Sequence, residues 1–448
     1  MLKIPWLPKI ATAPFCPSEV QGSIHVPPGA SIWKKIAIFA GPGLLVSVGY
    51  MDPGNWATDI EAGSRYGYNL LFVILFSSLA AIVLQLLSMR VGIVTGKDLA
   101  RLARDRFPKP VAFVLWIFAE LAIIATDVAE VLGSALALKL LTGVSLKTGI
   151  LITALDTFII LGLKGKGFRQ VEAIILGLIS TIGICYFVEL WLAAPVWGEV
   201  AKGFVPAPSK LSSPEAWYIA IGILGATVMP HNLYLHSSIV QTRRVEPTTE
   251  GKRQAIRLFT WDTSISLFLA FFVNAAILIL AATAFHQTGH HAVTEIDDAY
   301  NLLAPIVGST LAPLLFGIAL LAAGQSSTFT GTIAGQILLE GFLNLKIPCW
   351  QRRVITRGLA LIPAYVGVSI LGDSSTGDLL VLSQVILSMQ LPFAVGPLIL
   401  FATDFKLMGP LITKGLMKVT AWILFAIITS ANFFMLYQIF FKGENVGH

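Results

Sequence analysis

Four residues, Asp52-Pro53-Gly54-Asn55, interrupt an apolar stretch that runs from about residue 36 to 60. A carboxylate in the middle of a bilayer is costly, and the adjacent proline and glycine disfavour a continuous helix. Backbone groups freed by such a break are tolerated in a membrane only where they face protein or a water-filled cavity. A bound cation would offset the cost of the Asp52 charge, so the motif predicts a cation site.

A second apolar stretch, residues 217–240, is interrupted by Met229-Pro230-His231-Asn232. It again combines a helix-breaking proline with an ionisable side chain, and here a thioether stands beside them. Two interrupted membrane segments at corresponding places in two halves of a chain are typical of secondary transporters, whose substrate site lies at the bilayer midplane. The pair of motifs therefore predicts a transport site.

Composition supports a membrane protein. The 448 residues are 55% hydrophobic and only 12% charged. The net charge of +6 forms no basic stripe with interleaved aromatic residues, so we expect no nucleic-acid partner. Three scattered cysteines suggest neither a disulfide framework nor a metal cluster. No nucleophile–base or nucleotide-binding motif stands out, so we expect neither an enzyme nor a cofactor.

Eleven segments are long and apolar enough to cross a bilayer, which needs about 20 residues per helix. The chain is thus predicted to be an all-α polytopic membrane protein. The expected spans are 36–61, 68–94, 111–140, 147–163, 170–193, 216–242, 258–285, 308–341, 354–371, 377–403 and 419–441.

Most of the 31 Lys and Arg residues fall in the tail before the first span and in alternate loops after it. The positive-inside rule then predicts a cytoplasmic N-terminus and an extracellular C-terminus. Spans one to five and six to ten run in opposite directions, with a break in the first span of each group. This predicts a five-plus-five inverted repeat with broken helices 1 and 6. The expected divisions are a cytoplasmic tail (1–35), a first unit (36–193), an outer loop (194–215), a second unit (216–403), a loop with helix 11 (404–441) and an outer tail (442–448).

The donor atoms near the breaks indicate which cation is bound. Asp52 and Asn55 offer hard oxygens, unwound backbone such as the Ala226 carbonyl adds another, and Met229 offers a soft sulfur. Mixed oxygen and sulfur ligation favours Mn²⁺, Fe²⁺ or a neighbouring transition ion over Mg²⁺ and Ca²⁺. Gln384, in the tenth span, either joins the ion shell or makes an interhelical hydrogen bond.

The third span carries Glu120, Asp127 and Glu130. At 100° per residue the first two lie within about 20° of each other, and Glu130 falls on the same broad face. Three carboxylates on one stripe of a membrane helix predict a proton relay or a cation path. They equally suit an ion-pair network with the arginines that open span nine: Arg352, Arg353 and Arg357.

Two histidines, His231 and His236, follow the second break. Histidine titrates near neutral pH, which suits a proton carrier. His231 is predicted to take part in proton coupling, although it is close enough to Met229 to be a metal ligand instead. His236 is assigned a structural or exit-path role.

These motifs resemble the natural resistance-associated macrophage protein (Nramp) family of divalent metal transporters. The resemblance rests on Asp-Pro-Gly-Asn in the first span, Met-Pro-His-Asn in the sixth and Thr-Asp-Val-Ala-Glu in the third, and it covers about residues 36–441. It implies an amino-acid-transporter-like inverted repeat and proton-coupled import of Mn²⁺ and Fe²⁺. The implied metal ligands are Asp52, Asn55, Ala226, Met229 and, less clearly matched, Gln384. The implied proton-linked residues are Asp52, Glu130, Asp127, Glu120 and His231, with His236, Arg353 and Arg357 beside them.

Two other functions remain open from the sequence. A sodium-coupled amino-acid transporter would share the architecture, but Asp52 would repel its substrate's carboxylate. A cation channel would not need two broken helices and a dedicated Asp/Met site. For the metal transporter that the resemblance implies, we expect a monomer in the plasma membrane whose partners are the lipid bilayer, a metal ion such as Mn²⁺, Fe²⁺, Cd²⁺ or Co²⁺, and protons.

Overall fold

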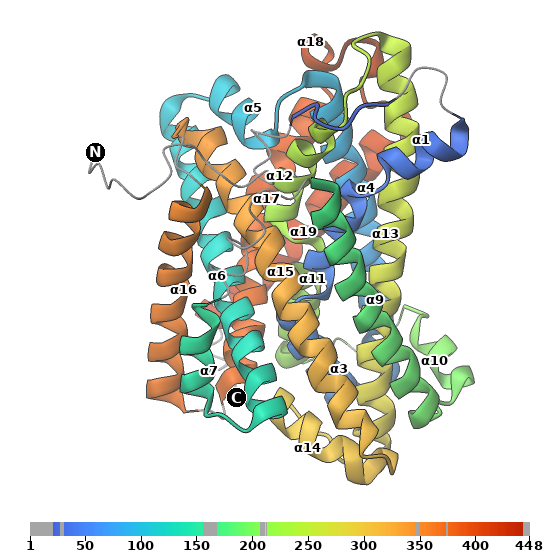
Figure 1. Cartoon of the computed structure of the whole chain (residues 1–448), viewed down its shortest axis with the longest axis vertical. Helices are drawn as coiled ribbons and strands as arrows, with labels where there is room; N and C mark the ends of the chain where they lie inside the picture. The colour runs from blue at the N-terminus through green and yellow to red at the C-terminus, as the bar shows by residue number, and fades with distance from the viewer. Residues whose placement is uncertain are drawn as a thin grey trace.

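The chain forms a bundle of α-helices in the computed structural model (Figure 1). The structure describes residues 21–26, 31–155, 168–206, 211, 213–345, 349–372 and 375–441, without the side chains of 349, 350, 352, 353 and 439–441. The α-helices in this part of the chain are α1 (Ile32–Phe39), α2 (Pro42–Val48), α3 (Pro53–Tyr66), α4 (Leu71–Thr95), α5 (Leu99–Arg106), α6 (Lys109–Thr142), α7 (Leu146–Thr153), α9 (Phe168–Ala193), α10 (Trp197–Gly203), α11 (Pro214–Val228), α12 (Pro230–Ile239), α13 (Thr249–Ala284), α14 (Ile296–Val307), α15 (Leu311–Leu343), α16 (Cys349–Leu371), α17 (Thr376–Ala402), α18 (Phe405–Met408) and α19 (Gly415–Phe441).

The predicted all-α membrane fold is confirmed. Ten helical stretches of the described residues are long and apolar enough to cross a membrane, and they correspond to ten of the eleven expected spans. The remaining span, 147–163, begins in α7 and continues outside the described residues. Helices that the sequence left as loops, such as α5, α10 and α14, are short and lie at the ends of the bundle (Figure 1).

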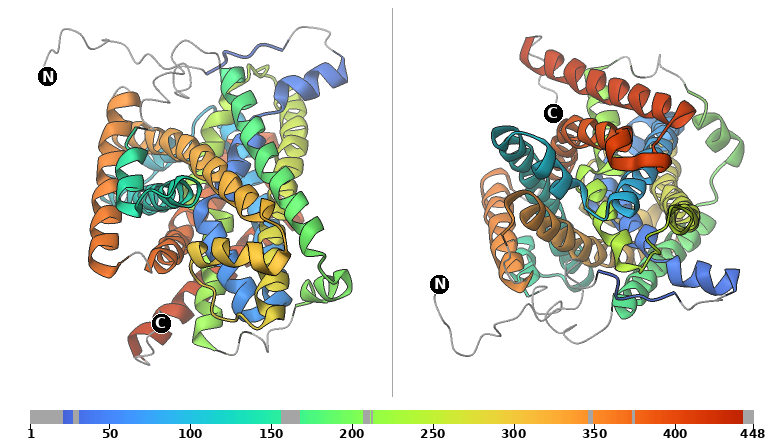
Figure 2. Two further views of the ribbon diagram at one scale, coloured as in Figure 1. Left: turned by 60° about the horizontal axis from the view of Figure 1, so that its bottom comes forward. Right: turned by 90° about the horizontal axis from the view of Figure 1, so that it is seen from above.

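Both predicted breaks are present, and the two broken helices run in opposite directions. A short 3₁₀ turn and Asp52 separate α2 from α3, while Met229 alone separates α11 from α12. The first half of each broken helix packs against the second half of the other: α2 contacts α12, and α3 contacts α11. The helices α16 and α19 lie at the edge of the bundle (Figure 2) and expose apolar side chains, as a lipid-facing helix does.

The two ends of the bundle are distinguished here by their short helices. The α5 face carries α1, α5 and α18, and the α14 face carries α7, α10 and α14 (Figure 1). On the α5 face, Ile24 forms an isolated parallel bridge with Arg243. Backbone bonds from Gly22 to Gln241 and from Ile24 to Thr242 hold this segment against the chain that leaves α12.

Glycines allow helix backbones to touch beside the breaks. A Cβ at Gly225 of α11 would lie 2.0 Å from the Gln384 carbonyl oxygen of α17. A Cβ at Gly92 of α4 would lie 2.1 Å from the Ser237 carbonyl oxygen of α12. Small residues at such crossings let membrane helices approach closely, and this packing holds the half-helices in place.

We expect Gly225→Ala to lower the stability of the protein by about 1–3 kcal/mol, because a methyl group there meets backbone that cannot rotate away. The measurement is the thermal unfolding midpoint in detergent. Gly177→Ala is the matched control: a Cβ at this glycine of α9 meets no atom within 4 Å. Alanine is the better helix former, so the control should be unchanged or slightly stabilised. Equal unfolding midpoints for the two variants would contradict the close approach of α11 and α17.

Candidate metal and proton site

Asp52 occupies the break in the first membrane helix. Its backbone is extended, with φ −71° and ψ 167°, and its carboxylate caps α3 by accepting the Asn55 N–H at 2.9 Å. Pro53 follows at the first helical position, where a backbone N–H would have no acceptor within the helix. Asp52 is fully buried. Its charge therefore lies at the positive end of the α3 dipole, which favours an anion.

Met229 forms the second break by itself. Its φ of 36° lies in the left-handed region, which residues other than glycine adopt at a cost of order 1–3 kcal/mol. Pro230 has no N–H, so it cannot bond the carbonyl of Ala226 four residues earlier. The break therefore frees a backbone oxygen at the end of α11 and holds a buried thioether beside it.

Asn55 joins the two breaks. With its amide nitrogen turned toward Asp52, it donates to Asp52 Oδ1 at 2.7 Å and to the Ala226 carbonyl at 3.3 Å. Its oxygen then accepts from Asn274 Nδ2 of α13 at 3.2 Å. A half-turn of the amide would put the Asn55 oxygen in the place of that nitrogen. The oxygens of Asp52, Asn55 and the Ala226 carbonyl would then face one point, which is an arrangement suited to a cation.

The Met229 sulfur lies against the first break. A Cβ at Gly49 would be 3.1 Å from this sulfur, and Asn232 Nδ2 lies 3.6 Å from it. Gln384 reaches the same region from α17. Its amide covers Gly54, where a Cβ would come within 1.8 Å of the amide nitrogen. The structure thus places at the two breaks all five groups that the sequence predicts as metal ligands.

The acidic stripe of α6 passes close to the first break. A Cβ at Gly133 would meet the Pro53 ring, and Glu130, one turn earlier, lies beside Gly331 of α15. Glu130 and Asp127 are buried, whereas Glu120 is partly exposed. Two of the three predicted relay carboxyls therefore lie in the protein interior near the site.

The two histidines have different surroundings. The His231 Nδ1 lies 3.4 Å from the Thr126 hydroxyl of α6, next to Asp127 in the sequence. His236 is held at both ring nitrogens, by Gln85 Oε1 at 3.0 Å and by the Thr263 hydroxyl at 3.3 Å. Two hydrogen bonds favour the structural role expected for His236, and the Thr126 contact connects His231 with the acidic stripe.

The span-nine arginines are only partly described. The Arg357 guanidinium is buried and donates through Nε and Nη2 to the Thr153 carbonyl at the end of α7, at 3.3 and 3.1 Å. The side chains of Arg352 and Arg353 lie outside the described residues. Arg357 therefore joins the last turn of α7 to α16.

Arg243 closes the α5 face beneath the site. It bonds Glu172 Oε1 of α9 at 2.7 Å and the backbone carbonyls of Ile38 and Ala40 at 3.1 and 2.6 Å. Asp262 of α13 accepts the backbone N–H groups of Gly41 and Gly43, which begin α2. These bonds fasten the first half of the first broken helix to α9 and α13.

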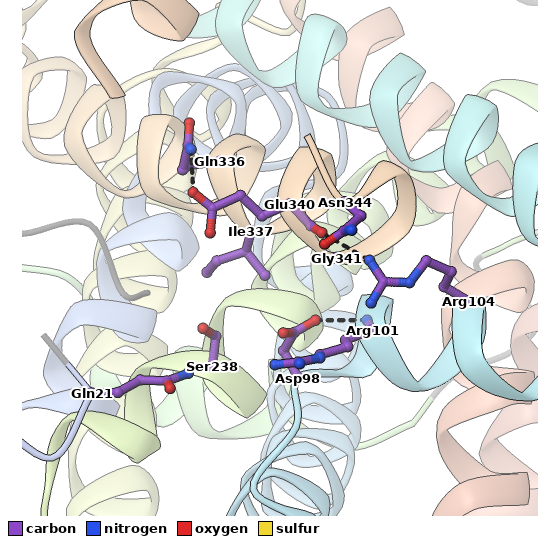
Figure 3. Close-up of a pocket in the computed structure, with 10 residues that line it drawn as sticks. All are labelled: Gln21, Asp98, Arg101, Arg104, Ser238, Gln336, Ile337, Glu340, Gly341 and Asn344. Carbon is purple, nitrogen blue, oxygen red and sulfur yellow. Dashed lines mark hydrogen bonds between the residues drawn. The ribbon is translucent and has the colours of Figure 1, made fainter. Parts of the chain in front are cut away.

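A cavity of about 280 Å³ opens on the same face between α5, α12 and α15 (Figure 3). Asp98 caps α5 by accepting the Arg101 N–H at 2.8 Å, and the Arg104 guanidinium donates to the Glu340 carbonyl at 3.2 Å. The Glu340 carboxylate also accepts a hydrogen bond from Gln336. The cavity is polar and lies at the end of α12.

Three polar residues near the site were missed in the sequence: Asn274, Asp59 and Glu189. Each is buried in a membrane helix. The signal was available, since a polar or ionisable side chain inside a membrane span marks a functional position by default. Unlike the two broken motifs, these three residues have no distinctive local pattern around them.

The comparisons with known proteins agree with this geometry. The family model described as natural resistance-associated macrophage protein-like matches residues 43–438. A divalent metal cation transporter, MntH, of Ralstonia nicotianae is 64% identical over 98% of this chain and 99% of its own length. The MntH 1 protein of Pseudomonas aeruginosa is 62% identical over 96% of this chain and 98% of its own.

Solved structures give the same result. A mutant of the Eremococcus coleocola manganese transporter superposes with a TM-score of 0.87 at 38% identity, covering 96% of this chain and 92% of that one. Mhp1, a nucleobase-cation-symport-1 family transporter, has a TM-score of 0.57 at 16% identity, which shows a shared fold alone. Broken helices of opposite direction, the polar site between them and the family match over most of the chain lead to one conclusion: this chain belongs to the Nramp family.

Proposed function

We propose that this protein imports divalent transition-metal ions together with protons across the plasma membrane by alternating access. The transported ions are Mn²⁺ and Fe²⁺, and also Cd²⁺ and Co²⁺. The N-terminus is cytoplasmic, the C-terminus is extracellular and one chain is the transport unit. The α5 face, where the positively charged loops gather, is then the inner face.

One observation carries the proposal: Asp52, Asn55 and the Ala226 carbonyl converge where the Met229 sulfur meets the first break. One anion, neutral oxygens and a thioether suit a borderline transition ion. Mg²⁺ and Ca²⁺ gain little from sulfur, so the thioether disfavours these more abundant ions. The names of the full-length relatives, which are divalent metal cation transporters, support the same substrate class.

The proton route and the conformational change follow from the surroundings of the site. His231 contacts Thr126 of α6, and Asp127 and Glu130 continue along that helix, so a proton leaving Asp52 has acceptors close by. On the inner face, the bonds from Arg243 and Asp262 to residues 38–43 must break before α2 can move away from the site. We assign release of the metal to that step.

We expect Asp52→Asn to reduce Mn²⁺ uptake into proteoliposomes by at least about 100-fold, because about 3 kcal/mol of ion binding is lost with the charge. Asparagine caps helices as well as aspartate, so the fold is retained. The control is Asp404→Asn, which alters the partly exposed cap of α18. Near-normal uptake by Asp52→Asn would remove Asp52 from the site. Uptake of a sodium-dependent amino acid instead of metal by the unaltered protein would overturn the proposed function.

Met229→Ala should leave Mn²⁺ uptake present but reduced, because Mn²⁺ accepts water in place of sulfur. Cd²⁺ uptake should fall about tenfold further, and Mg²⁺ or Ca²⁺ should begin to compete with Mn²⁺. Competition assays in proteoliposomes measure this selectivity. Met435→Ala removes a comparably buried methionine of α19, a helix without a break, and serves as the control. An unchanged order of ions in Met229→Ala would show that the thioether does not select among metals.

Glu130→Gln keeps the side-chain shape and removes its charge. We expect metal binding at equilibrium to stay within about threefold of wild type while proton movement falls about tenfold, because the relay loses a titratable group. Parallel recordings of Mn²⁺ uptake and internal acidification in liposomes give both quantities. Glu250→Gln, an exposed position of α13, is the control. If Glu130→Gln retains both signals and their pH dependence, the acidic stripe is a structural network and not a relay.

A further inference from the structure

Two buried carboxyl groups lie on the α14 side of the metal site and have no role in the function described so far. Asp59 of α3 is 1% exposed and Glu189 of α9 is 0% exposed. Within the described part of the chain, one oxygen of Asp59 and both oxygens of Glu189 lack a hydrogen-bond partner. Burying an isolated carboxylate is far too costly to persist without compensation.

A ring contact between Trp56 of α3 and Tyr186 of α9 connects the two helices one turn from both carboxyl groups. The rings of Trp56 and Tyr186 meet edge to face with centroids 5.0 Å apart. The ring of Phe316 in α15 also meets Trp56 edge to face, with centroids 5.1 Å apart. Asp59 lies three residues after Trp56, and Glu189 three residues after Tyr186, so each carboxyl is on the same helix face as its ring. The Tyr186 phenol lies within electrostatic range of both carboxyls.

On the α14 side of the helices packed against α3, Lys139 of α6 is engaged by Asp297, and Glu215 of α11, Asp298 of α14 and Asp378 of α17 are acidic. On α9 itself, Tyr186 and Cys185 are the other titratable groups within electrostatic range of Glu189. Three of the described helices pack against α9, and the first of them, α2, has no titratable side chain. The charged residues of the other two, α13 and α15, lie toward the α5 face; those farthest along each helix from that face are Asp262 and Glu340. On α3, Arg65 is engaged by Glu61 at 3.1 Å. The compensating charge must come from a small cation that enters the pair.

The surroundings favour a proton over a metal ion. Two carboxyls and a phenol, walled by aromatic rings, give fewer ligands than Mn²⁺ or Mg²⁺ requires. The helices α3 and α9 are unbroken here, so they present no free backbone carbonyls. A carboxyl that is buried without a compensating hydrogen bond or cation favours its neutral form, so each group of the pair holds a proton.

We propose that Asp59 and Glu189 form a proton-binding pair that loads protons from the α14 face before they reach Asp52. Asp59 is seven residues, or about 10 Å, along α3 from Asp52. Glu189 is four residues before the end of α9. The pair thus lies between the α14 face and the metal site, opposite the α6 stripe that receives protons on the way in. Its role in transport rests on the proposed proton coupling, whereas its proton occupancy does not.

Infrared difference spectroscopy of the full chain in lipid tests the occupancy directly. A protonated carboxyl gives a carbonyl stretch that a carboxylate lacks. We expect Glu189→Gln to remove or shift such a band at neutral pH, and Asp59→Asn to shift it as well. Glu199→Gln, on the exposed surface of α10, should leave the band unchanged. A spectrum of Glu189→Gln identical to that of wild type, with the variant folded, overturns the proposal.

Transport measurements then test the role. Glu189→Gln should reduce the stimulation of Mn²⁺ uptake by an inward proton gradient at least threefold, while equilibrium Mn²⁺ binding changes less than twofold. Tyr186→Phe keeps the ring contact with Trp56 and should shift the pH midpoint of uptake without unfolding the protein. A uniform loss at every pH in both variants, with no change in the pH midpoint, would indicate a structural role and overturn the loading step. Wild-type uptake that is independent of pH would overturn the proton coupling of the proposed function while leaving the infrared result to decide the pair.

Discussion

Two prolines without a backbone N–H interrupt the helices at the centre of this protein, and the surrounding structure depends on these breaks. Pro53 and Pro230 cannot extend the hydrogen bonding of the helices before them, so both membrane helices stop in the interior of the bundle. Unbonded backbone is tolerated in a bilayer only when protein or water covers it. The rest of the bundle provides that cover: α6 packs on Pro53, and α17 packs on Gly54 and Gly225.

The breaks also explain why the site is both polar and strained. Asp52 gains the N-terminal dipole of α3, the Ala226 carbonyl is left without its helical partner, and Met229 adopts a positive φ. The burial of the Asp52 charge, the unbonded carbonyl and the positive φ each cost stability in the absence of an ion. The hydrogen bonds of Asn55 with Asp52, Ala226 and Asn274 recover part of this cost. A bound cation would replace those hydrogen bonds with ligation. The Asn55 amide would then exchange between two orientations, one that donates hydrogen bonds and one that directs its oxygen at the cation.

The two faces of the bundle contrast in how they are joined. On the α5 face, Arg243, Glu172 and Asp262 fasten the start of α2 through charge-assisted hydrogen bonds to backbone. On the α14 side, Asp59 and Glu189 are buried without such partners among the described residues. The bonds on the α5 face hold α2 closed over the site. The unpartnered carboxyls on the α14 side favour entry of a small cation between them and the site. This asymmetry suits a transporter that loads from the α14 face and releases at the α5 face.

The sequence by itself determined the membrane spans and the breaks, because hydrophobic length, proline chemistry and the cost of Asp52 act locally along the chain. Local spacing likewise placed Asp127 and Glu130 on one face of a helix. Only the tertiary structure decided which groups meet across helices. Examples are the Ala226 carbonyl with Asn55, His236 with Gln85, and Arg357 with the Thr153 carbonyl. Helical periodicity gives the direction in which a side chain points but not the helix that it faces. For that reason the sequence marks Asn274, Asp59 and Glu189 as single polar residues in apolar helices, and only the packed helices show which groups lie near each of them.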